Sequence, residues 1–199
     1  MTGTAGRGRP RSEEARRAVL SAALELCDRD GYQALTIKGI AEAAGVGRQT
    51  VYRWWPTKEA VLLEALRDLV ERDAPTFSPD TGEPLEDLRN FLEAVFDVTA
   101  RRTGQAVAGL MAEAQRDPEF APRLQHTLLG PRRQALRGVL ERGVRQGELS
   151  DGQVSLDLAV DIAFGVMWYR LLSGHAAVDA ELAREVAVAL RRLLGDQPK

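Results

Sequence analysis

Residues that form disulfides or bind metals are scarce in this chain of 199 residues. Its one cysteine, Cys27, excludes a disulfide within the chain, and its place on the apolar face of an expected helix favours a small buried hydrophobe over a redox sensor. The two histidines, His126 and His175, lie far apart, and neither has a metal-ligand spacing such as HxxxH or CxxC. We therefore expect no metal site and no other cofactor.

The sequence motifs of nucleotide-binding proteins and hydrolases are also absent. None of the 18 glycines forms a GxGxxG or GxxxxGK arrangement after a strand, so nothing supports nucleotide binding. The GxSxG motif of serine hydrolases is missing, and Cys27 has no catalytic partner nearby. We expect that the protein is not an enzyme.

Long apolar runs and alternating strand patterns are missing too. No run approaches the roughly 18 apolar residues of a membrane-spanning helix, and the basic N-terminus lacks the apolar segment of a signal peptide. We therefore expect a cytoplasmic protein that does not enter a membrane. Hydrophobic residues make up 44% of the chain, enough for a sizeable core, and their spacing is helical. The expected fold class is all-α, with helices over residues 12–30, 37–44, 48–54, 58–73, 85–102, 104–117, 118–129, 131–147, 153–173 and 179–194.

Pro131 leaves two readings of its helix open. A proline is tolerated in the first turn of a helix, so Pro131 starts a helix over residues 131–147 in one reading. In the other, it kinks a longer helix that runs over residues 118–147.

The net charge of −2 hides an uneven distribution along the chain. Residues 1–58 carry ten Lys and Arg against six acidic residues, a net of +4. Residues 59–199 carry 17 basic and 23 acidic residues, a net of −6. A basic head on an acidic body fits a protein that binds a polyanion with one end only.

Residues 36–59, TIKGIAEAAGVGRQTVYRWWPTKE, predict two short helices joined by a glycine turn. Thr36 can cap the first helix with its hydroxyl group, and Gly45 can end it in the left-handed conformation that glycine adopts without cost. The second helix runs from Arg48 to Trp54 and ends before Pro56. This arrangement is typical of the helix-turn-helix unit, whose second helix lies in a DNA major groove.

The second helix is too polar for a core element, since only Val51 and Trp54 can face inward. A surface that reads base edges would use such a helix, and a helical hairpin with a solvated outer face is the alternative. Its polar or amphipathic residues are Arg48, Gln49, Thr50, Tyr52 and Arg53.

The run AxxxGVxxxTxYRWWPTKEAV resembles the DNA-binding domain of the TetR family of bacterial transcriptional regulators. Two positions depart from the family pattern. Gly47 stands where a serine cap is usual, which is expected to loosen the start of the second helix, and Trp54-Trp55 replaces the commoner His-Phe or Tyr-Phe pair. The matching residues are Gly45, Val46, Thr50, Tyr52, Trp54, Trp55, Lys58 and Glu59, in register with Gly31, Leu35, Thr36 and Ile40.

The resemblance implies that the second helix contacts DNA. Arg48 and Gln49 are the candidates for base edges, since both side chains make bidentate hydrogen bonds. The segment Arg7–Arg11 resembles the AT-hook element, whose arginines lie in a narrow minor groove, and an ordinary solvated tail is the alternative. Phosphate contacts are expected from Thr36, Thr50, Tyr52 and Lys58. The full predicted set is Arg9, Arg11, Thr36, Lys38, Arg48, Gln49, Thr50, Tyr52, Arg53 and Lys58.

The resemblance also implies an effector cavity and a dimer interface. The predicted divisions are a disordered basic arm (1–11), a DNA-binding domain with a bridging helix (12–73), a linker (74–84) and a ligand-binding and dimerisation domain (85–195). Candidates around a small hydrophobic or aromatic effector are Phe91, Phe96, Met111, Gln115, His126, Phe164, Met167, Trp168 and Arg170. Candidates for a homodimer interface along the last two helices are Leu158, Ile162, Val166, Tyr169, Leu182, Val186, Leu190 and Leu193. A monomeric bundle is the alternative.

These features predict a TetR-type repressor that binds a palindromic operator as a dimer and is released by a small molecule. One rival is a ligand-insensitive protein that uses the same scaffold for DNA architecture or for a protein partner. A second rival is an enzyme with a vestigial DNA-binding domain, for which no catalytic constellation is visible. Binding to a defined palindrome would favour the regulator, and sequence-blind binding would favour the architectural protein.

Overall fold

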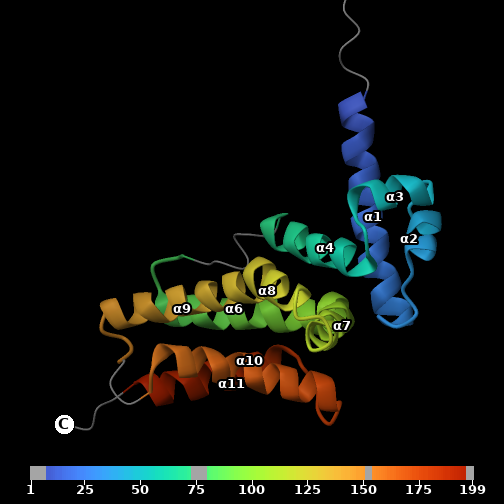
Figure 1. Ribbon diagram of the computed structural model, residues 1–199. Helices are drawn as coiled ribbons and strands as arrows, with labels where there is room; N and C mark the ends of the chain where they lie inside the picture. The colour runs from blue at the N-terminus through green and yellow to red at the C-terminus, as the bar shows by residue number, and fades with distance from the viewer. Residues whose placement is uncertain (1–7, 73–79, 151–153, 196–199) are drawn as a thin grey trace, which may run out of the picture. The chain divides into compact units, whose positions relative to one another are not determined.

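The computed structural model describes residues 8–72, 80–150 and 154–195, with side chains from Ser12 onward. Every regular element in these ranges is a helix (Figure 1), which confirms the expected all-α fold class. Within the same ranges, no helix is both long enough and apolar enough to cross a membrane. Contacts along the chain define two compact units, residues 1–69 with 105–124 and residues 70–104 with 125–199.

The first unit combines the predicted DNA-binding segment with a later part of the chain. It contains α1 (Gly8–Asp30), α2 (Ile37–Ala43), α3 (Arg48–Trp54) and most of α4 (Lys58–Arg72). It also contains nearly all of α7 (Gly104–Ala114) and the short α8 (Phe120–Leu124). In the division predicted from the sequence, residues 105–124 belong to the C-terminal ligand-binding and dimerisation domain, and that division stays a prediction.

Helix α1 begins earlier than predicted. The sequence analysis placed its start at Ser12 after a disordered arm, whereas the helix begins at Gly8. Pro10 lies in the first turn, where backbone N–H groups have no partner within the helix, so the proline removes no hydrogen bond. The side chains of Arg9 and Arg11 lie outside the described part of the chain, and their minor-groove contact stays a prediction.

The core of the first unit draws on its first four helices. Val19 and Cys27 of α1, Ile40 of α2, Val51 of α3 and Leu62 of α4 are fully buried. Burial raises the pKa of the Cys27 thiol to about 11, so the thiol is protonated at neutral pH. Cys27 is therefore the small buried hydrophobe that the sequence indicated.

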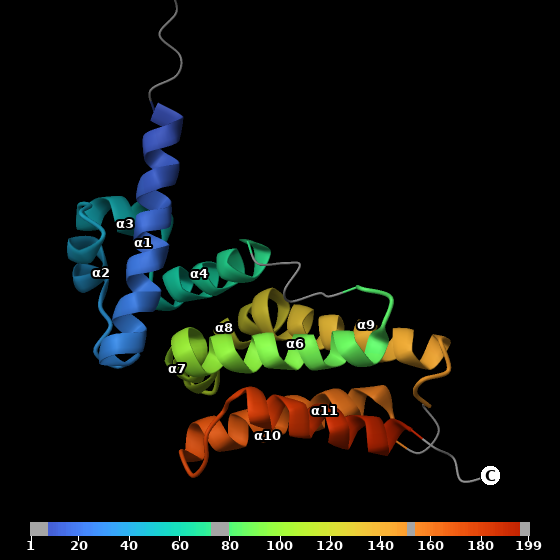
Figure 2. The same cartoon turned by 180° about the vertical axis from the view of Figure 1, so that it is seen from behind.

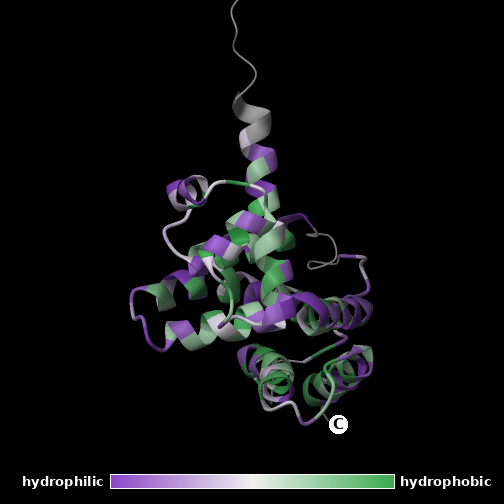
Figure 3. Ribbon diagram, turned by 90° about the vertical axis from the view of Figure 1, so that its right-hand side faces the viewer, coloured by the Kyte–Doolittle hydropathy of each residue, from purple (hydrophilic) through white to green (hydrophobic). Residues whose placement is uncertain are grey.

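The second unit consists of α6 (Pro84–Val98), α9 (Gly130–Arg145), α10 (Leu156–Ser173) and α11 (Ala180–Leu194). Helix α6 packs against α9 and α11, and α10 packs against the same two helices. Helices α10 and α11 lie side by side in both views (Figures 1 and 2). The helices of the chain carry both hydrophobic and hydrophilic residues (Figure 3), as expected of helices that are partly buried and partly exposed. The shared core includes Phe91, Phe96, Leu136, Leu140, Met167 and Leu190.

Two wide turns of π-helix, η1 (Thr99–Thr103) and η2 (Gln125–Leu129), join helices that the sequence analysis treated as separate. Each turn is followed by a glycine. A Cβ atom on Gly104 would lie 2.7 Å from the carbonyl oxygen of Thr99, and one on Gly130 would lie 2.9 Å from that of Gln125. Because glycine has no Cβ atom, Gly104 and Gly130 permit both wide turns. Pro131 occupies the first turn of α9, as in the reading that starts a helix at this proline. Helix α9 also continues directly from η2, as in the reading of one longer helix.

Candidate nucleic-acid interface

The turn between α2 and α3 has the geometry that the sequence predicted. The Thr36 hydroxyl accepts a hydrogen bond of 3.1 Å from the backbone N–H of Gly39 and so caps α2. Gly45 is left-handed, with φ of +66°, and the backbone N–H of Val46 donates to the carbonyl of Ala41 at 3.0 Å. Gly47 leaves α3 without a side-chain cap, as its departure from the family pattern implied.

Helix α3 presents a polar face over a single buried anchor. Val51 is fully buried, whereas the side chain of Tyr52 is 52% exposed. Arg48, Gln49 and Arg53 are exposed as well, and Thr50 is half-buried. The inward role of Val51 is confirmed, and this one short helix carries five of the ten residues predicted to contact DNA.

The two arginines of α3 differ from Arg17 and Arg29 of α1. Arg48 and Arg53 form no hydrogen bond or ion pair with any residue in the described ranges, although the Arg53 guanidinium lies 5.5 Å from the centre of the Trp54 ring. By contrast, Arg17 and Arg29 are both exposed and both bind nearby carboxylates. Cations that the protein leaves without a counter-ion are available to a polyanion.

The tryptophan pair splits into one structural and one surface residue. Trp55 is 3% exposed, and its indole N–H donates to Glu64 of α4 at 2.7 Å. Arg16 of α1 donates to the other oxygen of Glu64 at 2.8 Å, so one carboxylate links three segments. Burial opposes the charge of Arg16, but Glu64 outweighs it and raises the pKa of the guanidinium. Trp54 is half-buried and meets the Trp55 ring edge-on. The sequence analysis did not identify Glu64, because no local pattern marks it.

Replacing Glu64 with alanine is expected to destabilise the first unit by about 2–3 kcal/mol, since hydrogen bonds to a charged group contribute about 1.5–3 kcal/mol. The loss would leave the indole N–H and much of the Arg16 charge unpaired. The change in the free energy of unfolding is measured by denaturant unfolding followed by tryptophan fluorescence. Glu13→Ala is the matched control, because Glu13 also pairs with Arg16 but is half-exposed, and exposed pairs contribute well under about 1 kcal/mol. Equal losses in both variants would contradict the linking role of Glu64.

Lys58 has an internal role that the sequence analysis did not foresee. Its ammonium group donates to the carbonyl oxygen of Tyr32 at 2.9 Å and lies 4.2 Å from the centre of the Tyr32 ring. The Tyr32 hydroxyl donates to Glu59 at 2.7 Å. Burial opposes the Glu59 charge, but this hydrogen bond and others lower the pKa of Glu59 overall. These contacts explain a cation at the start of α4 without DNA, so a phosphate contact by Lys58 stays a prediction.

The predicted effector residues are divided between the two units. Phe91, Phe96 and Met167 belong to the buried core of the second unit, with Phe164 and Trp168 packed against it. Met111 and Gln115 belong to the first unit instead. Gln115 and His126 are exposed, and Arg170 donates to the carbonyl of Ala177 at 3.2 Å. Gln115 lies in the turn after α7 and His126 in η2, and helical periodicity could not separate buried from exposed positions in either segment.

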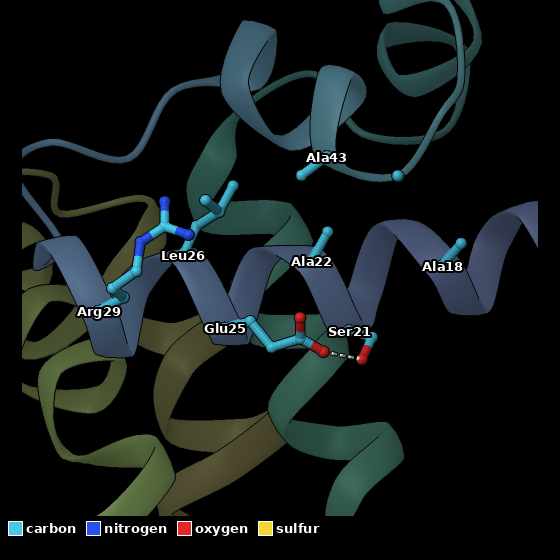
Figure 4. A pocket seen from close by; sticks show the side chains of 8 residues that line it. Ala18, Ser21, Ala22, Glu25, Leu26, Arg29 and Ala43 are labelled. Atoms are coloured by element: carbon cyan, nitrogen blue, oxygen red, sulfur yellow. Dashed lines mark hydrogen bonds between the residues drawn. The ribbon is translucent and has the colours of Figure 1, made fainter.

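Two surface hollows in the described residues lie elsewhere. One, of about 290 Å³, is lined mainly by small side chains of α1 and α2, with a hydrogen bond between Ser21 and Glu25 (Figure 4). The other, of about 220 Å³, lies between α6 and α11 and is lined by Leu85, Leu88, Arg89, Arg184, Ala187, Val188 and Arg191. Neither is lined by a predicted effector residue. The described residues contain no cluster of His, Cys, Asp and Glu that could hold a metal ion.

The predicted dimer residues divide by exposure. Leu158 is 50% exposed, Tyr169 is 68% exposed and Leu193 is 41% exposed, while Ile162 and Val166 are half-buried. The prediction does not hold for the other three residues, because the core of the same unit buries them: Leu182, Val186 and Leu190. The apolar stripe of α11 faces inward because α11 packs along α6.

Comparison with known proteins identifies both parts of the chain. Residues 19–65 match the family model described as bacterial regulatory proteins of the tetR family, and residues 78–190 match the tetracyclin repressor-like C-terminal domain. The HTH-type transcriptional regulator YdeS of Bacillus subtilis (strain 168) is 31% identical over 182 residues, covering 92% of this chain and 90% of the relative.

Solved structures agree with these matches. The TetR family transcription regulator SCO0332 is 29% identical, with a TM-score of 0.70 over 92% of this chain and 100% of that protein. The regulator FadR from Bacillus subtilis, solved in complex with stearoyl-CoA, has the same fold, with 22% identity and a TM-score of 0.70 over 89% of this chain and 98% of FadR. These matches agree with the helix-turn-helix, whose second helix, α3, exposes polar side chains. The chain belongs to the TetR family of DNA-binding transcriptional regulators.

Proposed function

We propose that the protein is a repressor that binds a palindromic operator as a homodimer and leaves it when a small molecule binds. The observation that carries this proposal is the outer face of α3, where Arg48 and Gln49 are exposed and Arg48 has no partner in the described ranges. The arginine can donate two hydrogen bonds to guanine, and the glutamine can donate one hydrogen bond to adenine and accept another in the major groove. Thr50 and Tyr52 flank them and would bind phosphates.

The homodimer is supported by an apolar stripe on α10. Leu158, Tyr169 and Leu172 are 50%, 68% and 62% exposed, and the half-buried Ile162 and Val166 lie between them at helical spacing. A contiguous exposed apolar face of this kind is typical of an interface. A twofold partner on this face would give the protein two copies of α3, as a palindrome requires.

Release by a small molecule is supported by the structure of FadR, which was solved with stearoyl-CoA bound. A ligand that binds the operator-free conformation more tightly lowers the affinity for DNA by the same coupling free energy. Helices α6 and α10 contribute to one core, and we place the effector in the part of the chain that forms this core.

Selection of DNA ligands from a random pool by the purified protein tests the proposal. We expect an enriched palindrome whose half-site centres are separated by about one helical turn or a multiple of it, and affinity that falls with rising salt concentration. Enrichment of no sequence, with binding lost at moderate salt, would contradict it and favour the architectural rival.

A further inference from the structure

The hollow between α6 and α11 lies wholly within the second unit and has an apolar floor. Leu85 and Leu88 of α6 and Ala187 and Val188 of α11 form this floor. Leu88 is buried and Leu85 and Ala187 are half-buried, whereas Val188 is 49% exposed. The two packed helices therefore leave a strip of apolar surface open between them, which we call the α6–α11 groove.

Three exposed arginines frame the α6–α11 groove, and none of the described residues that line it is acidic. Two of the arginines have weak partners nearby: Arg89 lies 3.3 Å from Glu86, and Arg184 lies 4.0 Å from Glu93. The third, Arg191, forms no hydrogen bond or ion pair with any residue in the described ranges. Ion pairs at exposed positions contribute little to stability, so these guanidinium groups can exchange their partners for carboxylates of another molecule.

The arginines of α11 stand at the two ends of the apolar strip. Arg184, Val188 and Arg191 follow one another at positions i, i+4 and i+7, which lie on one side of a helix. Seven residues of helix span about 10 Å, so the two positive charges lie at opposite ends and do not converge on one point. A small anion with a single charge matches only one end. The volume of about 220 Å³ is also below the roughly 300–1,000 Å³ of pockets that enclose a small molecule.

An amphipathic helix has the dimensions that the groove requires. Acidic residues seven positions apart on such a helix are separated by the same distance of about 10 Å, and residues three and four positions after the first lie between them on the same side. Laid along α11, this side brings one carboxylate to each arginine and apolar side chains to Val188. Helices bind apolar grooves of other proteins in this way.

We propose that the α6–α11 groove is a docking site for an acidic amphipathic helix of a partner protein. The partner pairs two acidic residues with Arg184 and Arg191 and packs its intervening apolar residues on Val188 and Leu85. Complementary charge fixes the register of the helix in the groove, and apolar burial supplies the affinity. This interaction adds a protein partner to the operator and the small molecule of the proposed function.

The test begins with a displayed library of alanine-based helical peptides, randomised at positions i, i+3, i+4 and i+7 of one face. Selection on the wild-type protein should enrich Asp or Glu at the two outer positions and large apolar residues at the two inner ones. Fluorescence anisotropy then compares the selected peptide with a version that carries lysine at both outer positions. We expect the lysine peptide to bind at least about 10-fold more weakly, and binding of the acidic peptide to weaken as the salt concentration rises.

The double variant Arg184→Glu, Arg191→Glu should reverse this preference and bind the lysine peptide more tightly than the acidic one. Arg192→Glu is the matched control, because Arg192 shares the last turn of α11 with Arg191 and does not line the groove. Reversing the charge at either position has the same effect on the end of the helix. The control should keep the preference for the acidic peptide.

Enrichment of no acidic and apolar pattern, or equal binding of the two peptides to the wild-type protein, would overturn the inference even if a variant failed to fold. An unchanged preference in the double variant, or a lost preference in Arg192→Glu, would also overturn it. Sedimentation equilibrium distinguishes a second copy of this chain as the occupant: a double variant with a lower mass than the wild type would assign the groove to contact between subunits. All these measurements are made without DNA, so a failure of the proposed function leaves their result standing.

Discussion

A single methyl group added at Gly109 is expected to destabilise the first unit by about 1–3 kcal/mol, as overpacking in a core does. Gly109 lies in α7, where its Cβ would be 2.1 Å from Cγ of Tyr32. The Tyr32 ring has little room to move, because it is 6% exposed, bonded to Glu59 and covered by Lys58. Denaturant unfolding of Gly109→Ala measures the loss, and we also expect weaker DNA binding because the same unit carries α3.

Gly138→Ala is the matched control for this substitution. Gly138 also lies within a helix, α9, but a Cβ there has no atom within 4 Å. Alanine should therefore stabilise the protein by about 0.5–1 kcal/mol, the usual gain in a helix interior. We expect the free energy of unfolding to fall in Gly109→Ala and to rise in Gly138→Ala. A similar gain at Gly109 would contradict the close packing of α7 against Tyr32.

Replacing both Leu158 and Leu172 with aspartate is expected to separate the proposed dimer into monomers. Operator binding should then weaken by about 10²–10⁴-fold. This range is the avidity that a linked pair of binding modules gains over one module. Both leucines are at least half-exposed in the single chain, so the substitution should leave each subunit folded. Sedimentation equilibrium measures the mass, and a binding titration with operator DNA measures the affinity.

Gln134→Asp serves as the control for added charge, since Gln134 is an exposed residue of α9 outside the apolar stripe. This variant should keep the mass and the operator affinity of the wild type. A Leu158→Asp, Leu172→Asp variant that remained dimeric at micromolar concentration would show that the interface lies on another surface.

Local chemistry explains why the helix-turn-helix could be predicted from the sequence. The cap at Thr36, the left-handed Gly45 and the buried Val51 each depend on residues within a few positions of one another. The exposed face of α3 then follows, because a short helix with one buried anchor must present its other residues outward.

Contacts between distant segments account for what the sequence did not predict. Lys58 reaches the carbonyl of Tyr32, and Arg16 reaches Glu64, across 26 and 48 positions. Lys58 was therefore assigned to a phosphate contact, and the pairing of Arg16 with Glu64 was not predicted. Leu190 looked like an interface residue, but it lies in the core, since the stripe of a helix does not reveal which surface covers it.

The most direct test of the central claim, that α3 reads DNA bases, is to repeat the selection from random DNA with Gln49→Ala. Gln49 is exposed, and glutamine reads adenine through two hydrogen bonds. We predict that the palindrome persists while one A·T position in each half-site accepts other bases, at a cost of about 1–3 kcal/mol per half-site. Lys38→Ala, on α2, should instead weaken binding evenly without altering the selected sequence. An unchanged selected sequence with Gln49→Ala would contradict the account.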